Sequence, residues 1–349
     1  METQQIPLQY PGPLLARAER WYASELAARI GCGVKSSGLE PFYKSIVALA
    51  LTGKTDQAHQ MAGFLVSHCF NRTEGRFVEA SERVSYLQYS CCYRTSWILW
   101  GLVALSRADP QRAPFRQEVA SISSFLKSLQ DHTCGAVRSR PAQGAECDVL
   151  STAVAGLSFL QLGYHDRAFL AADFLVEHIQ QHQGQYPIRL RTSTTGKSVA
   201  DIGRDSRYYW YPPIRGKPMH YIPALASLLL AKVAGVAGES RYCTGAKMWL
   251  SALEQAPDSP LTSEYCGKIL WAAAEMVRLD SSTRYGAWVK PILDHLLSTQ
   301  TPLGPWWVPG HYSAYGRQPL DFTLDRTGEY IAVLSSVGLR KQRGNMYRV

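Results

Sequence analysis

The chain has 349 residues, of which 46% are hydrophobic and 19% charged, and its formal net charge is +9. This composition excludes a disordered chain and supplies a core for one large domain or two ordinary ones. Lysine and arginine are scattered along the chain, so we expect no nucleic-acid partner, and an anionic small-molecule substrate explains the positive charge equally well.

The expected elements are almost all helical. Apolar residues at a period of 3.6 predict twelve helices, and the best strand candidate, YPIRLRT at 186–192, predicts at most a short hairpin. In chain order the predicted helices span 13–31, 39–53, 55–70, 83–107, 111–130, 148–162, 165–182, 219–234, 239–254, 262–279, 283–299 and 320–337.

An internal repeat organises these helices into pairs. TGKTDQAHQMAGFL at 52–65 matches LGYHDRAFLAADFL at 162–175, with every identity at an offset of 110 residues. That offset equals two units of about 55 residues, and a helical hairpin is the natural unit of this length. A second series, EGRF, CGAV, QGQY and LGPW, places a glycine after alternate helices, at 75, 135, 184 and 304.

Short and long connections therefore alternate along the chain. We predict an all-α fold of six hairpins closed into an (α/α)6 barrel, with residues 1–349 as a single domain and the last helix pairing with the first. An open helical solenoid is the competing arrangement.

Hairpins that end in glycine–aromatic turns resemble the α/α-toroid proteins, which include terpenoid cyclases, protein prenyltransferase β subunits and six-hairpin sugar enzymes. The DxDD motif of the first group and the DDxxD motif of ionising terpene synthases are both missing, and no convincing zinc-ligand set is visible. The resemblance therefore implies the fold, and the fold does not imply the function.

In such a ring the long connections gather at one end, where we expect the site. They span 71–82, 131–147, 183–218, 255–261 and 300–319. Aromatic and basic residues in two of them, and at the helix start that follows the longest, suit substrate binding, although aromatic side chains also serve simply to pack loops onto a rim. These candidates are Arg204, Tyr209, Trp210, Tyr221, Trp306, Trp307, His311 and Tyr312.

The inner helices add further candidates. Tyr89 and Tyr93 share one helical face with Trp97 and Trp100, and we expect the tyrosines to line the centre and the tryptophans to pack the core. Four residues are candidate acid–base groups: Asp148, Asp205, His220 and Asp325. Asp148 also suits a helix N-cap, and Asp325, one turn inside the last helix, suits either the lumen or pairing with a base.

No HExxH or clustered Cys/His pattern occurs, and no glycine-rich phosphate loop follows a strand, so we expect neither a metal nor a nucleotide cofactor. The eight cysteines form no CxxC pair, and neither a signal peptide nor a membrane span is visible, so we expect reduced thiols in a cytoplasmic protein.

The inner faces contain more tyrosine and tryptophan than carboxylate. We therefore predict a cofactor-independent cyclase or isomerase that acts on a hydrophobic, unsaturated small molecule, terpenoid- or polyketide-like, in natural-product biosynthesis. Aromatic walls would fold the substrate, and an Asp, His or Tyr would transfer a proton. A carbohydrate-active enzyme (glycoside hydrolase, lyase or epimerase) is the alternative, and a non-catalytic toroidal binding scaffold is the second alternative.

Overall fold

The computed structural model describes residues 12–31, 39, 41–78, 90–142, 145–182, 185–193, 208–213, 216–281, 283–307 and 319–338. Within these ranges the twelve predicted helices are all present. They are α1 (Gly12–Gly31), α2 (Ser45–Leu51), α3 (Thr55–Cys69), α4 (Cys91–Ala108), α5 (Arg116–Leu129), α6 (Val149–Gln161), α7 (His165–His182), α8 (Tyr221–Ala237), α9 (Ser240–Leu253), α10 (Cys266–Leu279), α11 (Gly286–Thr299) and α12 (Pro319–Gly338).

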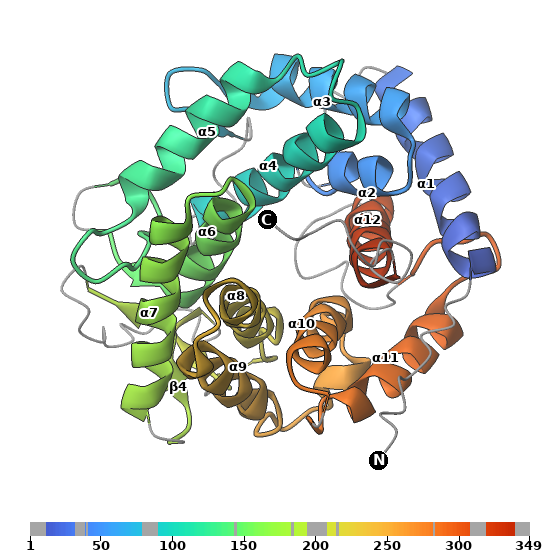
Figure 1. Cartoon of the computed structure of the whole chain (residues 1–349). Helices are drawn as coiled ribbons and strands as arrows, with labels where there is room; N and C mark the ends of the chain where they lie inside the picture. Colours follow the sequence, from blue (N-terminus) through green and yellow to red (C-terminus); the bar gives the residue numbers. More distant parts are fainter. Residues whose placement is uncertain are drawn as a thin grey trace.

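The helices form two concentric rings. Figure 1 shows the even-numbered helices around the centre and the odd-numbered helices outside them. Each inner helix contacts the next, and α12 contacts both α10 and α2, so the inner ring is closed. α1 packs on α12, which confirms the predicted pairing of the first and last helices and the (α/α)6 barrel rather than an open solenoid.

The glycine turns that follow the outer helices explain how the outer ring is spaced. Gly135 has a φ of +76°, and a Cβ on it would lie 2.1 Å from the backbone oxygen of Leu170 in α7. Gly304 has a φ of +115°, and its Cβ would lie 2.6 Å from the oxygen of Arg17 in α1. Only glycine suits such a conformation at so close an approach. The turn that follows an outer helix therefore packs directly against the next outer helix.

The strands are two residues long and belong to the connections. β4 (Ile188–Arg189) and β5 (Arg191–Thr192) lie within the predicted hairpin segment. β4 pairs with β6 (Trp210–Tyr211), and β5 pairs with β3 (Cys147–Asp148). The remaining pair joins β1 (Phe70–Asn71) to β2 (Arg76–Phe77). The two ends of the longest connection are thus fastened to each other and to the start of α6.

One predicted turn lies elsewhere. The sequence predicts that the helix starting at 219 ends at 234, but α8 continues to Ala237 and ends at Gly238, whose φ of 72° is that of a left-handed cap. Among the described helices none is long and apolar enough to cross a membrane, and the seven described cysteines are free thiols.

Candidate active site

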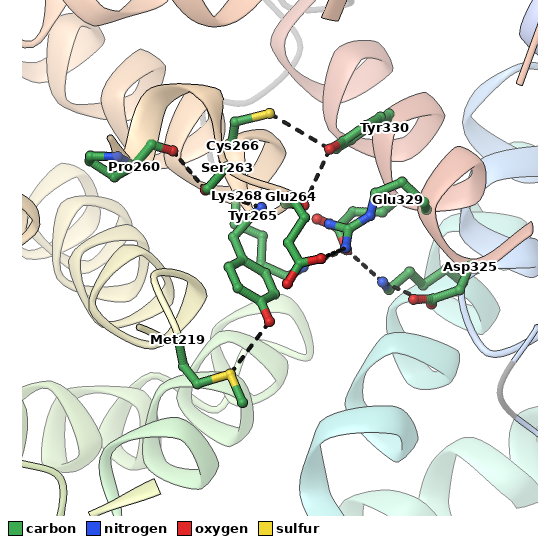
Figure 2. A network of polar contacts seen from close by, with 12 residues as sticks. Met219, Pro260, Ser263, Glu264, Tyr265, Cys266, Lys268, Asp325, Glu329 and Tyr330 are labelled. Atoms are coloured by element: carbon green, nitrogen blue, oxygen red, sulfur yellow. Dashed lines mark hydrogen bonds and ion pairs between the residues drawn. The ribbon is translucent and has the colours of Figure 1, made fainter. Parts of the chain in front are cut away.

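The long connections lead into the inner helices at one end of the ring, and ionisable side chains gather there. Lys44 precedes α2, and Lys268 lies in the first turn of α10. Figure 2 shows Lys268, Glu264, Asp325 and Glu329 directed toward one another. The side chains of this group are at most 9% exposed. We call it the central cluster, and its members are Lys44, Arg94, Glu264, Lys268, Asp325, Arg326 and Glu329.

Glu329 connects three inner helices. Its Oε2 accepts a hydrogen bond from Lys44 Nζ at 2.5 Å and also contacts Lys268 Nζ. Burial alone would raise the pKa of Glu329, but Lys268, Lys44 and Arg326 together lower the pKa to about 2. Glu329 is therefore ionised at neutral pH and holds α2, α10 and α12 together by charge.

Asp325 lies one turn before Glu329 on the same face of α12. Its Oδ1 is 2.9 Å from Lys44 Nζ, so the predicted pairing of Asp325 with a base occurs across the closing seam of the ring. Burial and the neighbouring Asp325 raise the pKa of the Tyr43 hydroxyl well above its usual value. The carboxylate of Asp325 thus lies beside the ammonium group of Lys44 and the protonated phenol of Tyr43 at the centre of the ring.

Two arginines complete the cluster. Arg326 Nη2 is 3.7 Å from Glu264 Oε2, and its guanidinium lies over the rings of Tyr265 and Tyr330, at 5.7 Å from each centroid. Burial lowers the pKa of Arg94 to about 9, and Asp325 opposes that effect. Both arginines therefore remain cationic at neutral pH.

Aromatic rings surround these charges from three inner helices. Tyr93 packs on Tyr221 with ring centroids 5.8 Å apart, and Tyr221 packs on Tyr265 at 5.0 Å. Deeper in the ring, Trp100 stacks on Trp271 at 4.7 Å. We call this set the aromatic wall, and it comprises Tyr43, Tyr93, Trp97, Trp100, Tyr221, Tyr265 and Trp271. Tyr93, Tyr221, Tyr265 and Trp100 remain partly exposed, whereas Trp97 is buried.

His220, at the start of α8, lies behind this wall. Its Nδ1 is 2.8 Å from the hydroxyl of Tyr211, and its Nε2 is 3.3 Å from Asp258 Oδ1. Burial lowers the pKa of His220, and the Asp258 carboxylate opposes that effect. The imidazole is 1% exposed, so in this structure it faces its two neighbours rather than the centre.

Asp148 caps α6. Its Oδ1 accepts from the amide of Ser151 and its Oδ2 from the hydroxyl of Ser151, both at 2.7 Å. Burial raises the pKa of Asp148, while Arg191 and these hydrogen bonds oppose the rise. The N-cap that the sequence favours is present, and it uses both oxygens of the carboxylate.

The aromatic candidates of the long connections lie at the rim. Trp210 has the guanidinium of Arg189 over its ring at 4.8 Å, and Arg191 lies over Tyr209 at 4.9 Å. Trp306 is 2% exposed and donates from Nε1 to the oxygen of Leu296, whereas Trp307 is 42% exposed. The other predicted site residues lie outside the described residues: Tyr89, Arg204, Asp205, His311 and Tyr312.

None of the four cations of the cluster, Lys44, Arg94, Lys268 and Arg326, was among the predicted site residues. Lys44 and Lys268 each stand before an apolar run, in FYKSIVALAL and YCGKILWAAA. A single lysine at the start of a fully buried helix was the available signal, because such a residue requires a buried partner.

The described residues contain no group of three or more His, Cys, Asp or Glu side chains placed to hold a metal ion.

Comparisons with known proteins find a similar fold in several solved structures. No protein-family model and no curated sequence matches the chain. A D-mannose isomerase has a similar structure, with a TM-score of 0.60 and 10% identity over 92% of this chain and 87% of that one. An unsaturated glucuronyl hydrolase specific for heparin is also similar, with a TM-score of 0.65 and 10% identity over 95% of this chain and 99% of that one. The cellobiose 2-epimerase of Bacillus thermoamylovorans has a TM-score of 0.60 and 11% identity over 85% of this chain and 88% of that one.

These similarities confirm the α/α-toroid fold and correct the predicted function. The similar proteins act on carbohydrates, so the prediction of a cyclase for terpenoid- or polyketide-like metabolites is wrong, and the carbohydrate-active alternative is favoured. The physical reason is visible in the cluster. The aromatic rings that suggested a hydrophobic substrate surround a dense group of buried charges, which suits a polyhydroxylated substrate better.

Proposed function

We propose that this protein is a carbohydrate-active enzyme that isomerises or epimerises a sugar by moving a proton within the central cluster. One observation carries the proposal. Lys44 forms a buried salt bridge with the carboxylate of Asp325 at 2.9 Å, and two further buried cations, Arg94 and Arg326, lie close enough to interact with that carboxylate by charge, inside a ring of aromatic side chains.

The charge of the cluster favours proton abstraction over glycoside hydrolysis. Hydrolysis passes through an oxocarbenium-like transition state, which buried ammonium and guanidinium groups destabilise. Removal of a proton next to a sugar carbonyl produces an enediolate, and the same cations stabilise that developing negative charge. Asp148, a fully buried carboxyl group whose pKa is raised by that burial, has both oxygens bound to Ser151 and makes a poor general acid.

The proposed reaction needs a base, an anion-stabilising site and a binding surface. Tyr93 and Tyr221 of the aromatic wall stack on the sugar, and Asp325 removes the proton from the carbon beside the carbonyl of the open-chain form. Lys44, Arg94 and Arg326 hold the enediolate oxygens. The proton then returns to the neighbouring carbon, which gives an isomer, or to the opposite face of the same carbon, which gives an epimer.

The test uses a panel of aldoses, ketoses and disaccharides, including D-mannose and cellobiose, with products separated by chromatography. Asp325→Asn should lower turnover by about 100-fold or more, because it removes the base while Lys44 keeps Glu329 as its partner. Asp173→Asn, on the outer helix α7, is the matched control and should leave turnover unchanged. Equal turnover in Asp325→Asn and the unaltered protein would refute the assignment, and release of monosaccharides from disaccharides would indicate hydrolysis instead.

A further inference from the structure

Two lysines share a single carboxylate oxygen at the centre of the ring. Lys44 and Lys268 both contact Oε2 of Glu329, and each side chain is at most 3% exposed. Their ammonium groups are therefore close neighbours in a region shielded from water. Like charges at such a distance repel strongly in a low dielectric, and one carboxylate compensates only one of them.

The two lysines are not equivalent. Lys44 Nζ has a second carboxylate, Asp325, at 2.9 Å. Among the described residues, the carboxylate that forms a salt bridge with Lys268 is Glu329, and the rest of its surroundings include the rings of Tyr221 and Trp97, 5.5 and 5.9 Å from Nζ. Loss of a proton from Lys268 relieves the repulsion and leaves Lys44 fully paired. Burial and the neighbouring Lys44 and Arg326 lower the pKa of Lys268 to about 7, although Glu329 opposes this.

We propose that Lys268 is a nucleophilic amine that forms an imine with the carbonyl carbon of an open-chain sugar; the sugar as carbonyl compound rests on the function proposed above. A lysine desolvated beside another cation is a known way to activate this nucleophile. Its position beside Tyr221 places the amine next to the part of the aromatic wall that remains partly exposed.

The step balances without a further reactant. The neutral nitrogen of Lys268 bonds to the carbonyl carbon, and the carbonyl oxygen leaves as water with the two amine hydrogens. Protonation of the imine makes the adjacent C–H more acidic for Asp325, which removes that proton to give an enamine. Return of the proton to the opposite face of the same carbon restores the imine, and addition of water then releases the epimer and the free amine. While the iminium is present, Glu329 faces a cationic group where it faced the neutral amine.

Reductive trapping tests the proposal. The purified protein is incubated with D-mannose or with glyceraldehyde, reduced with cyanoborohydride, and examined by intact mass and peptide mapping. We expect one adduct per chain, mapped to Lys268, with a rate that rises as pH passes through about 7. Surface lysines such as Lys290, which is 83% exposed, should be modified more slowly than Lys268 at neutral pH.

Matched variants and peptide mapping each test independently whether Lys268 is the reactive amine. Lys268→Arg should abolish the fast adduct, and Lys290→Arg should leave it unchanged. Peptide mapping on the unaltered protein decides the matter even where Lys268→Arg folds poorly. The imine proposal is overturned if adducts form only on surface lysines, or if no adduct forms. If the protein isomerises a sugar without forming an adduct on Lys268, the proposed function remains and the imine proposal is rejected. An adduct with glyceraldehyde but no sugar turnover supports the amine and removes the proposed function.

Discussion

At the scale of single residues, Glu329 is the side chain on which the centre depends. Its carboxylate contacts the ammonium groups of Lys44, which precedes α2, and Lys268, in α10, and it is shielded from solvent because it is 1% exposed. The favourable charge interactions exist only while all three partners are in place. The same carboxylate therefore has a structural role in the ring and sets the charge of the proposed site.

Glu329→Gln should destabilise the protein by about 3 to 5 kcal/mol, because it leaves two buried lysines without their shared charge. Urea denaturation measures this change in the free energy of unfolding. Glu239→Gln is the control: its salt bridge with Arg241 is about half exposed and should contribute about 1 kcal/mol or less. A Glu329→Gln protein as stable as the control would show that the cluster is not held by this carboxylate.

Because the pKa of Lys268 is lowered in the folded protein, we expect the stability of the protein to depend on pH. Its folded-state pKa of about 7 lies below its value in the unfolded chain, so above pH 7 the unfolded chain binds more protons. The free energy of unfolding of the unaltered protein should therefore rise by about 2 kcal/mol from pH 7 to pH 9, relative to Lys268→Met. Denaturation of both proteins at the two pH values provides the comparison. A constant difference between them would mean that Lys268 titrates as an ordinary lysine.

At the scale of elements, glycines set how closely the inner helices approach. A Cβ on Gly101 of α4 would lie 2.7 Å from Cβ of Ile46 and 2.8 Å from the amide nitrogen of Val47, near the start of α2. That distance is too short for any side chain, so the two helices would have to move apart. Lys44 lies at the same end of α2, which couples this packing to the position of the central cluster.

Gly101→Ala should cost about 1 to 3 kcal/mol through overpacking. Gly63→Ala, in the outer helix α3, is the matched control, because its Cβ would meet nothing within 4 Å and alanine favours a helix by about 1 kcal/mol. Thermal unfolding should show a lower Tm for the first variant and an unchanged or higher Tm for the second. The opposite order would contradict the close approach of α2 and α4.

The elements were predictable from the sequence because their signals are local. Helical periodicity and the turn glycines each act within one hairpin, the 110-residue offset then marks two hairpin units, and the count of six hairpins favours closure. The partners in the site were not predictable in the same way. Lys44 and Glu329 are 285 positions apart, and only closure of the ring brings them together. The substrate class was misjudged because tyrosine and tryptophan suit sugars as well as hydrophobic metabolites.

At the scale of the whole molecule, the ring closes where its proposed chemistry lies. The seam between the first and last inner helices is formed by Lys44 on one side and by Asp325 and Glu329 on the other. A substrate bound at the centre would therefore contact residues from opposite ends of the chain. This arrangement places the acid–base groups on buried helices rather than on loops, which favours a fixed geometry.

The most direct test of the proposed function is proton transfer on the sugar itself. The protein is incubated in D2O with D-mannose, D-glucose and cellobiose, and the C2 proton is followed by NMR. We predict that at least one sugar forms its ketose or its C2 epimer, with deuterium entering at the reacting carbon, and that Asp325→Asn stops the reaction. Sugars that keep every C–H bond while glycosidic bonds are cut, or that do not react at all, would contradict the proposal.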